Sequence, residues 1–286
     1  MTMYTRLFLS FAFCFSFISF SNAQSIAFYA DAMVNASEPE HRQYASELFY
    51  EMFSADLESS DSFSKTYDDL PWISIQYPED HSFRIISWQI DLGEGKYNYQ
   101  GFVQTNDNKN FAIGSKSKRE SFDGNDILDV ENWSGGLVYK IITTGHDDIK
   151  YYALTYRVDD KFTKVKTLEP LVVSDSSVTI GRQEHFGGGS GAGHLSARMA
   201  LIYSADSNAS ITYEEESDRL VFDNLITVQG RLPGQGPTQV PDGSYKAFEW
   251  KDGGWMYIDK LYTETNEGPL NASQSKKLDK RLFKKG

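Results

Sequence analysis

A glycine-rich run, FGGGSGAG at residues 186–193, is the first segment of the chain whose composition could support chemistry. A phosphate-binding loop ends in Gly-Lys-Ser or Gly-Lys-Thr and leads into a helix whose backbone amides hold the phosphate. Here His194 follows Ala192 and Gly193. Ser190 comes close to a nucleophile elbow, but Ala192 stands where that pattern has its last glycine. The run therefore predicts a hairpin connection rather than a nucleotide site or a catalytic serine.

Two Ser-x-x-Lys patterns, Ser62–Lys65 and Ser115–Lys118, could pair a serine nucleophile with an activating lysine. The serine enzymes that use this pattern complete their site with Ser-Asp-Asn and Lys-Thr-Gly elements. The chain contains neither element. No catalytic residue is therefore predicted from a motif.

The sequence also lacks a clear metal-binding motif. A loop with the composition of a calcium site contains Asp123, Asn125, Asp126 and Asp129. Its spacing departs from the Asp-x-Asp-x-Asp-Gly arrangement, and the bidentate glutamate is misplaced. His185 and His194 flank the glycine-rich run and could meet across a hairpin, but two ligands do not make a metal site. The sequence predicts no metal site and no cofactor.

Glycan hydrolysis by a pair of carboxylates stays open, because such carboxylates are distant in sequence and have no local signature. The 5 tryptophans and 17 tyrosines would suit a surface that faces sugars. Alternating aromatic residues in strands, however, more often pack in a β core. A hydrolase would require two acidic side chains in one cleft, about 5 to 10 Å apart.

The elements that must position these residues begin with a helical segment over residues 24–60. Ser37, Pro39 and Glu40 resemble a capping-box start, with proline in the first turn. The apolar stripe expected to face the sheet consists of Tyr44, Leu48, Phe49, Met52 and Phe53. A shorter helix over Ile26–Val34 could precede it.

Residues 61–265 read as a β-rich domain, because short runs of β-branched and aromatic residues alternate with tight polar turns. The expected strands are Trp72–Tyr77, Phe83–Ile90, Tyr97–Thr105, Leu137–Thr143, Ile149–Val158, Arg198–Tyr203, Ile211–Glu214, Leu220–Leu225 and Trp255–Leu261. The segment Gly230–Gly243, GRLPGQGPTQVPDG, reads as a long loop. The fold class is mainly β, an antiparallel meander (sandwich, barrel or propeller-like) with one or two N-terminal helices.

Residues 1–23 have the three parts of a secretory signal peptide. Arg6 precedes an apolar run from Leu7 to Phe20, and cleavage after Ala23 would leave Gln24 as the first mature residue. The run is shorter than the roughly 20 residues that a membrane span requires, so no transmembrane segment is predicted. We expect an exported protein, periplasmic or secreted. Its mature part has no cysteine, because Cys14 is the only one.

The mature chain is strongly acidic. Loss of Arg6 changes the net charge from −12 to −13, and the basic tail, residues 266–286, ends in a stretch from Lys276 that alone carries +5. The remaining body, up to residue 275, therefore has a charge of −18. Nucleic acid is not an expected partner, because binding it requires lysines and arginines that neutralise phosphates.

Several stretches together are similar to an uncharacterised family of exported proteins from Bacteroidetes-type bacteria. They are Ser82–Trp88, Tyr97–Gly101, Leu137–Ile142, Tyr151–Leu154, Leu220–Leu225, Pro241–Tyr245 and Gly254–Trp255. The chain departs from the family at Leu154–Arg157, where a Leu-Gly-Trp-Asp-like turn is usual. The resemblance implies export and a single β-rich domain, and it implies no activity.

The function predicted from the sequence is that of a non-enzymatic envelope protein, either structural or binding an unknown ligand or envelope protein. Long loops on a rigid scaffold are where binding residues tend to lie. The candidate binding residues are Trp88, Asp242 and Tyr245, in segments that combine an aromatic side chain with polar groups. The alternative is an envelope hydrolase that acts on glycans through dispersed carboxylates.

Overall fold

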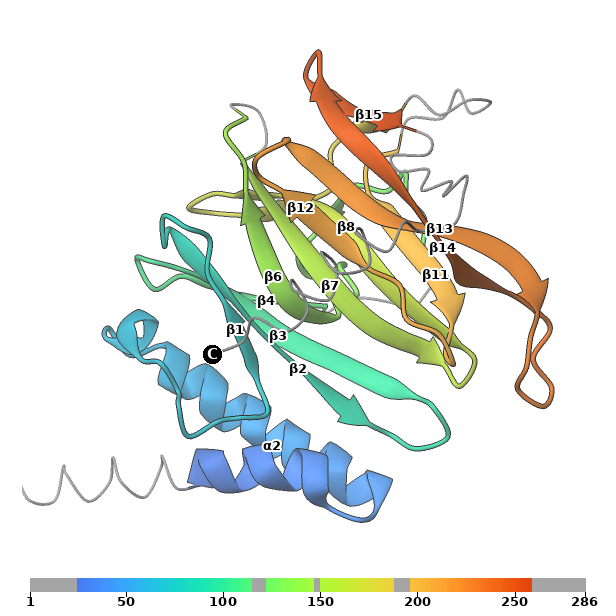
Figure 1. The fold of residues 1–286 in the computed structure, drawn as a ribbon. Coiled ribbons are helices and arrows are strands. Elements are labelled where there is room, and N and C mark those ends of the chain that lie inside the picture. Colours follow the sequence, from blue (N-terminus) through green and yellow to red (C-terminus); the bar gives the residue numbers. More distant parts are fainter. Residues whose placement is uncertain (1–24, 115–121, 147–149, 188–195, 259–286) are drawn as a thin grey trace, which may run out of the picture.

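The computed structural model describes residues 25–114, 122–146, 150–187 and 196–258. Strands form 47% and helices 15% of the residues that the structure describes, which makes the fold mainly β, as expected. The chain forms three sheets, which are stacked in layers, and the N-terminal helices cover the outer face of the first sheet (Figure 1). The stacked open sheets correspond to the sandwich among the alternatives. In the described part of the chain, no helix is both long and apolar enough to span a membrane.

The helical layer consists of a helix over residues 25–35 and of α2, Pro39–Leu57. Proline lies in the first turn of α2 as predicted, but the predicted serine cap is wrong. Glu38 is the N-cap residue, and no side chain caps the helix. Arg42 instead ties the preceding turn to the helix, since its guanidinium donates to the carbonyls of Ala36 and Ser37.

The buried stripe of α2 is rotated relative to the predicted one. Its apolar members Ala45, Phe49, Phe53 and Leu57 recur every fourth residue and face the first sheet. Tyr44, expected in the stripe, is 63% exposed. The predicted phase was wrong because large aromatic residues occur on both sides of this helix.

Sheet A contains β1 (Ser74–Gln76), β2 (Phe83–Asp91), β3 (Tyr97–Thr105) and β4 (Asn110–Ala112) in that spatial order. Side chains on one face of sheet A, including Trp88 and Phe102, pack against the helices. On the other face, Phe83, Ile85 and Val103 pack against sheet B. Because both faces of the sheet are covered, nearly every residue of β2 is buried.

Sheet B, the middle layer, has the order β5-β9-β8-β7-β6, and β11 pairs with the first half of β8. Its strands are β5 (Leu128–Asp129), β6 (Leu137–Thr143), β7 (Tyr151–Asp160), β8 (Thr163–Val173), β9 (Val178–Ile180) and β11 (Met199–Ser204). One face contacts sheet A through residues such as Ala153, and the other contacts sheet C through residues such as Leu168. The middle sheet therefore contributes to two of the three apolar cores.

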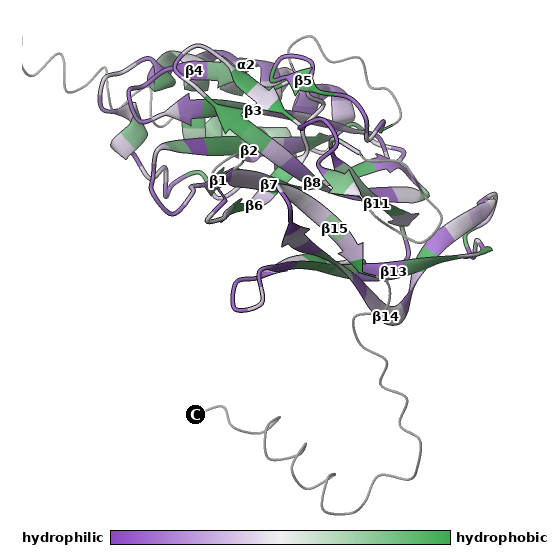
Figure 2. Cartoon of the chain, turned by 90° about the horizontal axis from the view of Figure 1, so that it is seen from above, coloured by the Kyte–Doolittle hydropathy of each residue, from purple (hydrophilic) through white to green (hydrophobic). Residues whose placement is uncertain are grey.

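Sheet C has the order β10-β15-β14-β13-β12. Its strands are β10 (Phe186–Gly187), β12 (Ile211–Glu214), β13 (Arg219–Gln229), β14 (Pro237–Lys251) and β15 (Gly254–Ile258). Figure 2 shows the long strands β13 and β14 extending along the outer side of the molecule. Side chains on the inner face of sheet C, among them Leu220, Phe248 and Trp255, form a core with sheet B.

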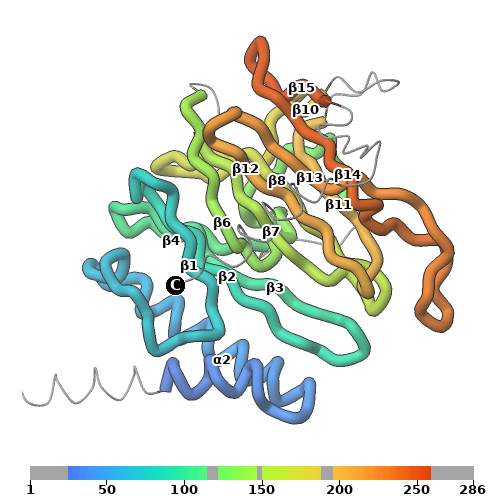
Figure 3. The backbone as a smooth tube through the Cα atoms, in the orientation of Figure 1, coloured from blue at the N-terminus to red at the C-terminus, as the bar shows by residue number. Residues whose placement is uncertain are grey.

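Each predicted strand overlaps a strand of the structure, and β3, β6 and β12 have the predicted bounds. β13 continues to Gln229, four residues past its predicted end, and the long strands β8 and β14 were not predicted. The loop predicted over Gly230–Gly243 is wrong in its second part, because β14 begins at Pro237. There Thr238 and Val240 pair with β13. The two prolines are tolerated since β15 pairs only with Ala247–Lys251, so this stretch is at an edge among the described strands. Figure 3 traces the resulting long hairpin.

We expect Phe49→Ala to lower the free energy of unfolding by about 3–5 kcal/mol, because it leaves a cavity between α2 and sheet A. Phe49 is fully buried against Trp88, with ring centroids 5.0 Å apart. The matched control, Tyr44→Ala on the exposed side of the same helix, should change it by no more than about 0.5 kcal/mol. Chemical denaturation measures both variants, and equal losses would show that the stripe is assigned wrongly.

Candidate functional site

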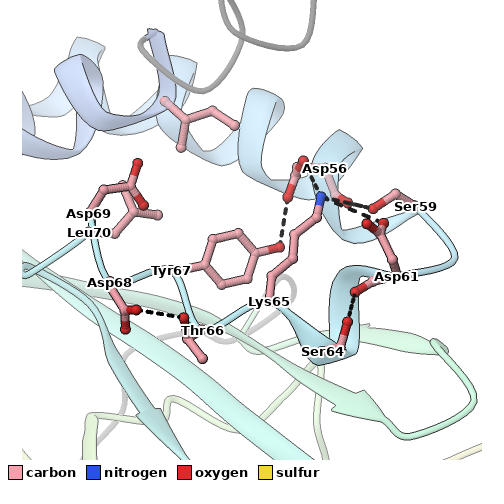
Figure 4. Close-up of a pocket in the computed structure, with 11 residues that line it drawn as sticks. Asp56, Ser59, Asp61, Ser64, Lys65, Thr66, Tyr67, Asp68, Asp69 and Leu70 are labelled. Atoms are coloured by element: carbon pink, nitrogen blue, oxygen red, sulfur yellow. Dashed lines mark hydrogen bonds and ion pairs between the residues drawn. The ribbon is translucent and has the colours of Figure 1, made fainter. Parts of the chain in front are cut away.

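A pocket of about 910 Å³ opens where α2 ends and the chain turns back along sheet A. This volume lies within the range of small-molecule sites, roughly 300–1,000 Å³. Figure 4 shows its lining, which consists of Ile26, Asp56, Ser59, Asp61, Ser64, Lys65, Thr66, Tyr67, Asp68, Asp69 and Leu70. Four carboxylates, the hydroxyls of two serines and a threonine, and one phenol thus line the pocket together with one ammonium group.

Lys65 places its ammonium group inside a ring of oxygens at one end of the pocket (Figure 4). Its Nζ lies 2.9 Å from Asp56 Oδ1 and 3.8 Å from Asp61 Oδ1. It also donates to Ser59 Oγ at 3.1 Å. Lys65 and Asp56 are about one-third exposed, so the arrangement is open to solvent and to an incoming ligand.

At this end of the pocket, the neighbouring groups favour the ionised form of Asp61 and the neutral form of Tyr67. The hydroxyl of Ser59 and then the charge of Lys65 lower the pKa of the Asp61 carboxyl. Burial, followed by the nearby Asp56 carboxylate, raises the pKa of Tyr67 far above its usual value. Tyr67 therefore remains a hydrogen-bond donor and donates to Asp56 Oδ2 at 2.7 Å.

Arg84 holds the backbone of the segment that lines the pocket, residues 62–65, from the side of sheet A. This fully buried side chain on β2 donates to the carbonyls of Ser62 and Lys65 at 2.8 and 2.7 Å. It also donates to Gln104 Oε1 and to the hydroxyl of Tyr77, at 2.8 and 2.9 Å. Its guanidinium lies 5.3 to 5.9 Å from the ring centroids of Phe63, Tyr67 and Tyr77. A rigid core strand therefore determines the course of the pocket segment.

The first Ser-x-x-Lys pattern does not form a catalytic pair. The Ser62 hydroxyl is buried and donates to the carbonyl of Leu57 at 2.8 Å. Lys65 instead points to Asp56, as described above. Both residues are consequently engaged in holding the turn. The second pattern, Ser115–Lys118, lies outside the described residues.

The structure does not bring the three predicted binding residues together. Trp88 is fully buried in the core between α2 and sheet A, and its indole donates to Gln100 Oε1 at 3.2 Å. Asp242 and Tyr245 lie on β14 of sheet C, where Tyr245 is 40% exposed. The burial of Trp88 leaves it no surface for a ligand, and the roles of Asp242 and Tyr245 stay predictions.

Within the described ranges, no three His, Cys, Asp or Glu side chains are placed to hold a metal ion. In the loop that has the composition of a calcium site, Asp123 and Asp126 give their backbone carbonyls to Arg198. The carboxylate of Asp129 accepts from Asn132. The predicted cleavage site at Ala23 and Gln24, together with Ser190 and His194, lies outside the described residues.

Known proteins do not add to this picture. No family model, curated protein or solved structure matches the chain. The functional argument therefore rests on the chemistry of the pocket.

Sequence reasoning missed the pocket, although a signal for it exists. Residues 54–69, SADLESSDSFSKTYDD, concentrate serine and aspartate directly after an amphipathic helix. Such a stretch reads as a solvated turn. What makes it a concave surface is Arg84, a single arginine in a strand whose pattern does not reveal that it is buried.

Arg84→Lys should lower the free energy of unfolding by about 2–4 kcal/mol, because an ammonium group cannot reproduce the fork of donors that reaches four acceptors. Arg219→Lys is the matched control. Arg219 donates to Glu249 at 2.8 Å in a half-exposed pair, for which a change of at most about 1 kcal/mol is expected. Thermal and chemical unfolding compare the two. A loss at Arg84 no larger than that at Arg219 would contradict the role given to Arg84.

Proposed function

We propose that this protein is an exported, non-enzymatic binding protein whose pocket beside α2 takes a cationic, hydroxyl-bearing ligand of the amino-sugar class. The observation that carries the proposal is the lining of the pocket, in which four aspartates face one lysine. The signal-peptide pattern of residues 1–23 and the resemblance to exported bacterial proteins support export.

The net charge of the pocket lining determines whether a cationic or an anionic ligand is favoured. Lys65 offsets one of the carboxylates Asp56, Asp61, Asp68 and Asp69, so the lining has a formal charge of −3. A carboxylate-lined cleft on an acidic body raises the local concentration of cations and accelerates their association. Anionic ligands such as phosphates and uronic acids would be repelled by the same field.

The end of the pocket around Lys65 is already arranged to hold an ammonium group. Asp56, Ser59 and Asp61 surround Nζ with three oxygens from separate side chains. A lysine ammonium is attached to a flexible stem, so it can leave this position when a ligand amine replaces it. The lysine thus marks where the ammonium group of the ligand binds.

The remainder of the lining suits a sugar ring. Ser64 and Thr66 offer hydroxyls, while the ring of Tyr67 provides apolar surface between the end with Asp56 and Lys65 and the end with Asp68 and Asp69 (Figure 4). Sugars combine a polar edge with an apolar face, and aromatic side chains with a polar tip contact both. An amino sugar satisfies the hydroxyls, the apolar surface and the carboxylates at once, which a plain polyamine does not.

Catalysis at the same carboxylates is less well supported. Asp56 and Asp61 contact the same Nζ, so their oxygens lie within about 7 Å of each other, a separation that glycosidases use. A glycosidase also needs one carboxylic acid with a raised pKa to protonate the leaving group. The pKa of the Asp61 carboxyl is instead lowered, by the Ser59 hydroxyl and then by the charge of Lys65. These groups are therefore suited to holding a cation.

Titration calorimetry with glucosamine and its β-1,4-linked dimer tests the proposal, with N-acetylglucosamine as the uncharged analogue. We expect the amine-bearing sugars to bind and the acetylated sugar to bind at least about tenfold more weakly, because it lacks the charge. Asp61→Asn should weaken binding about fivefold or more. Lys65→Met should strengthen it, because the competing ammonium group is removed while the apolar stem is kept.

Asp175→Asn is the control variant, since this 95% exposed carboxylate lies outside the pocket. It should leave the affinity unchanged. Equal binding of the acetylated and free amines, or no response to Asp61→Asn, would refute the proposal. Release of new reducing ends from the dimer, abolished in Asp56→Asn and Asp61→Asn, would instead favour the hydrolase.

A further inference from the structure

The turn between β3 and β4 of sheet A contacts the chain that lines the pocket, and its shape is fixed by its own hydrogen bonds. The backbone amide of Thr105 donates to the carbonyl of Lys109 at 2.9 Å, and that of Asn108 donates to the carbonyl of Thr105 at 2.9 Å. The hydroxyl of Thr105 donates to the Asp107 carboxylate and accepts from the amide of Lys109 at 3.1 Å. The turn therefore offers a rigid support to whatever packs against it.

Asn108 uses both ends of its side-chain amide on the pocket segment. Its Oδ1 accepts from the backbone amide of Phe63 at 3.2 Å and lies 3.1 Å from Ser62 Oγ. Its Nδ2 donates to the carbonyl of Ser60 at 2.9 Å. Because a backbone amide needs an acceptor and a carbonyl needs a donor, only one orientation of the side-chain amide satisfies both contacts. One side chain thus joins the backbone on the two sides of Asp61.

Asp61, which this bridge encloses, is one of the carboxylates of the pocket. It is the N-cap residue of the short 3₁₀ helix Ser62–Ser64. Its Oδ1 lies 3.8 Å from the Nζ of Lys65, and its side chain is 71% exposed. A side chain that is so exposed is positioned mainly by the backbone that carries it. The contacts of Asn108 with the residues before and after Asp61 therefore determine where this carboxylate lies.

The strand that follows the turn holds the beginning of the same segment. Asn110, on β4, donates from Nδ2 to the carbonyl of Leu57 at 3.1 Å, and Gln104, on β3, donates to it from Nε2 at 3.3 Å. Leu57 is the last residue of α2, and the last carbonyls of a helix have no partner within the helix. The pocket segment is consequently attached to the β3–β4 hairpin at Leu57 and again at Phe63.

The conformation of the turn explains which substitution isolates the role of the side chain. Asn108 has a φ of 64°, in the left-handed region, which asparagine adopts more readily than most residues with a side chain. Glycine adopts the same conformation without strain. Asn108→Gly therefore keeps the backbone of the turn and removes only the amide that holds the pocket segment.

We propose that Asn108 is a positioning residue of the ligand site, which holds the backbone around Asp61 and so fixes the place of this carboxylate. Asn108 does not line the pocket and does not touch the ligand. The inference rests on the proposed function for the identity of the ligand alone, since the contacts around Asp61 exist without one. A carboxylate that is already in place does not have to be ordered on binding, which favours a higher affinity.

Asn108 and Arg84 hold different parts of the segment. Arg84 donates to the carbonyls of Ser62 and Lys65, which follow Asp61. The carbonyl of Ser60, which precedes Asp61, is held by Asn108. Loss of the Asn108 side chain should therefore release Asp61 while Lys65 stays attached to sheet A.

An NMR titration of the side-chain carboxyl groups tests the positioning role without any ligand. The Ser59 hydroxyl, and then the charge of Lys65, hold the pKa of Asp61 below its usual value. In Asn108→Gly the pKa of Asp61 should rise toward that value, because the carboxylate no longer stays beside these groups. The pKa of Asp242, which Ser244 lowers on sheet C, should remain as in the wild type and so show that the variant is folded.

Asn106→Gly is the matched control. Asn106 belongs to the same turn and is exposed, and its backbone amide, which the substitution keeps, donates to the carbonyl of Ser82. The pKa of Asp61 should not change in this variant.

Calorimetry with the glucosamine dimer adds a readout that a purely structural role would not affect. Asn108→Gly should weaken binding about threefold or more. In this variant the further change Asp61→Asn should have a much smaller effect than the roughly fivefold loss expected in the wild type, because the displaced carboxylate no longer contributes. A side chain that merely stabilised the fold would leave the effect of Asp61→Asn unchanged.

An Asp61 pKa that is the same in the wild type and in Asn108→Gly would overturn the proposal, as would an equal effect of Asp61→Asn in both backgrounds. If the wild type does not bind the dimer and the pKa of Asp61 nevertheless rises in Asn108→Gly, the proposed ligand is wrong and the positioning role of Asn108 is supported.

Discussion

The buried guanidinium of Arg84 is the interaction on which the candidate site depends. Removing an unpaired cation from water costs several kcal/mol, and in the described residues no carboxylate lies at salt-bridge distance from Arg84. Four hydrogen bonds and three aromatic faces offset this cost. Two of the acceptors are carbonyls of the segment that forms the pocket. The charge can therefore stay buried only while that segment keeps its shape. The stability of the core of sheet A and the shape of the pocket consequently depend on each other.

The layered architecture explains how a chain with a single cysteine, which can form no internal disulfide, supports such a site. Sheets A and B are each covered on both faces, so the molecule has three apolar cores rather than one. The helices complete the first core, and sheet C completes the third. The pocket beside α2 lies where the chain leaves the end of this helix in a turn. Rigid strands thus present side chains from turns that would otherwise be free to move.

Much of the fold was predictable from the sequence. Strands such as β3 and β12 have clear apolar patterns bounded by polar turns, and the structure gives them the predicted bounds. β8 and β14 were not among the predicted strands. In the first half of β14, Pro237, Pro241 and Gly243 signal a loop, whereas an edge strand tolerates them. The pocket was not predictable, because it depends on a long-range contact between β2 and a turn. Trp88 was chosen as an aromatic ligand contact, yet its burial makes it part of the core.

The most direct test of the account is amide hydrogen exchange with and without the glucosamine dimer. Without ligand, the amides of Lys65 and Leu70, which donate to the carbonyls of Ser62 and Tyr67, should exchange far more slowly than the amide of Asp175, which lies in an exposed turn. With the dimer, exchange should slow further within residues 56–70 and nowhere else. Rapid exchange of this segment without ligand, or protection that falls instead on the hairpin carrying Asp242 and Tyr245, would contradict the account.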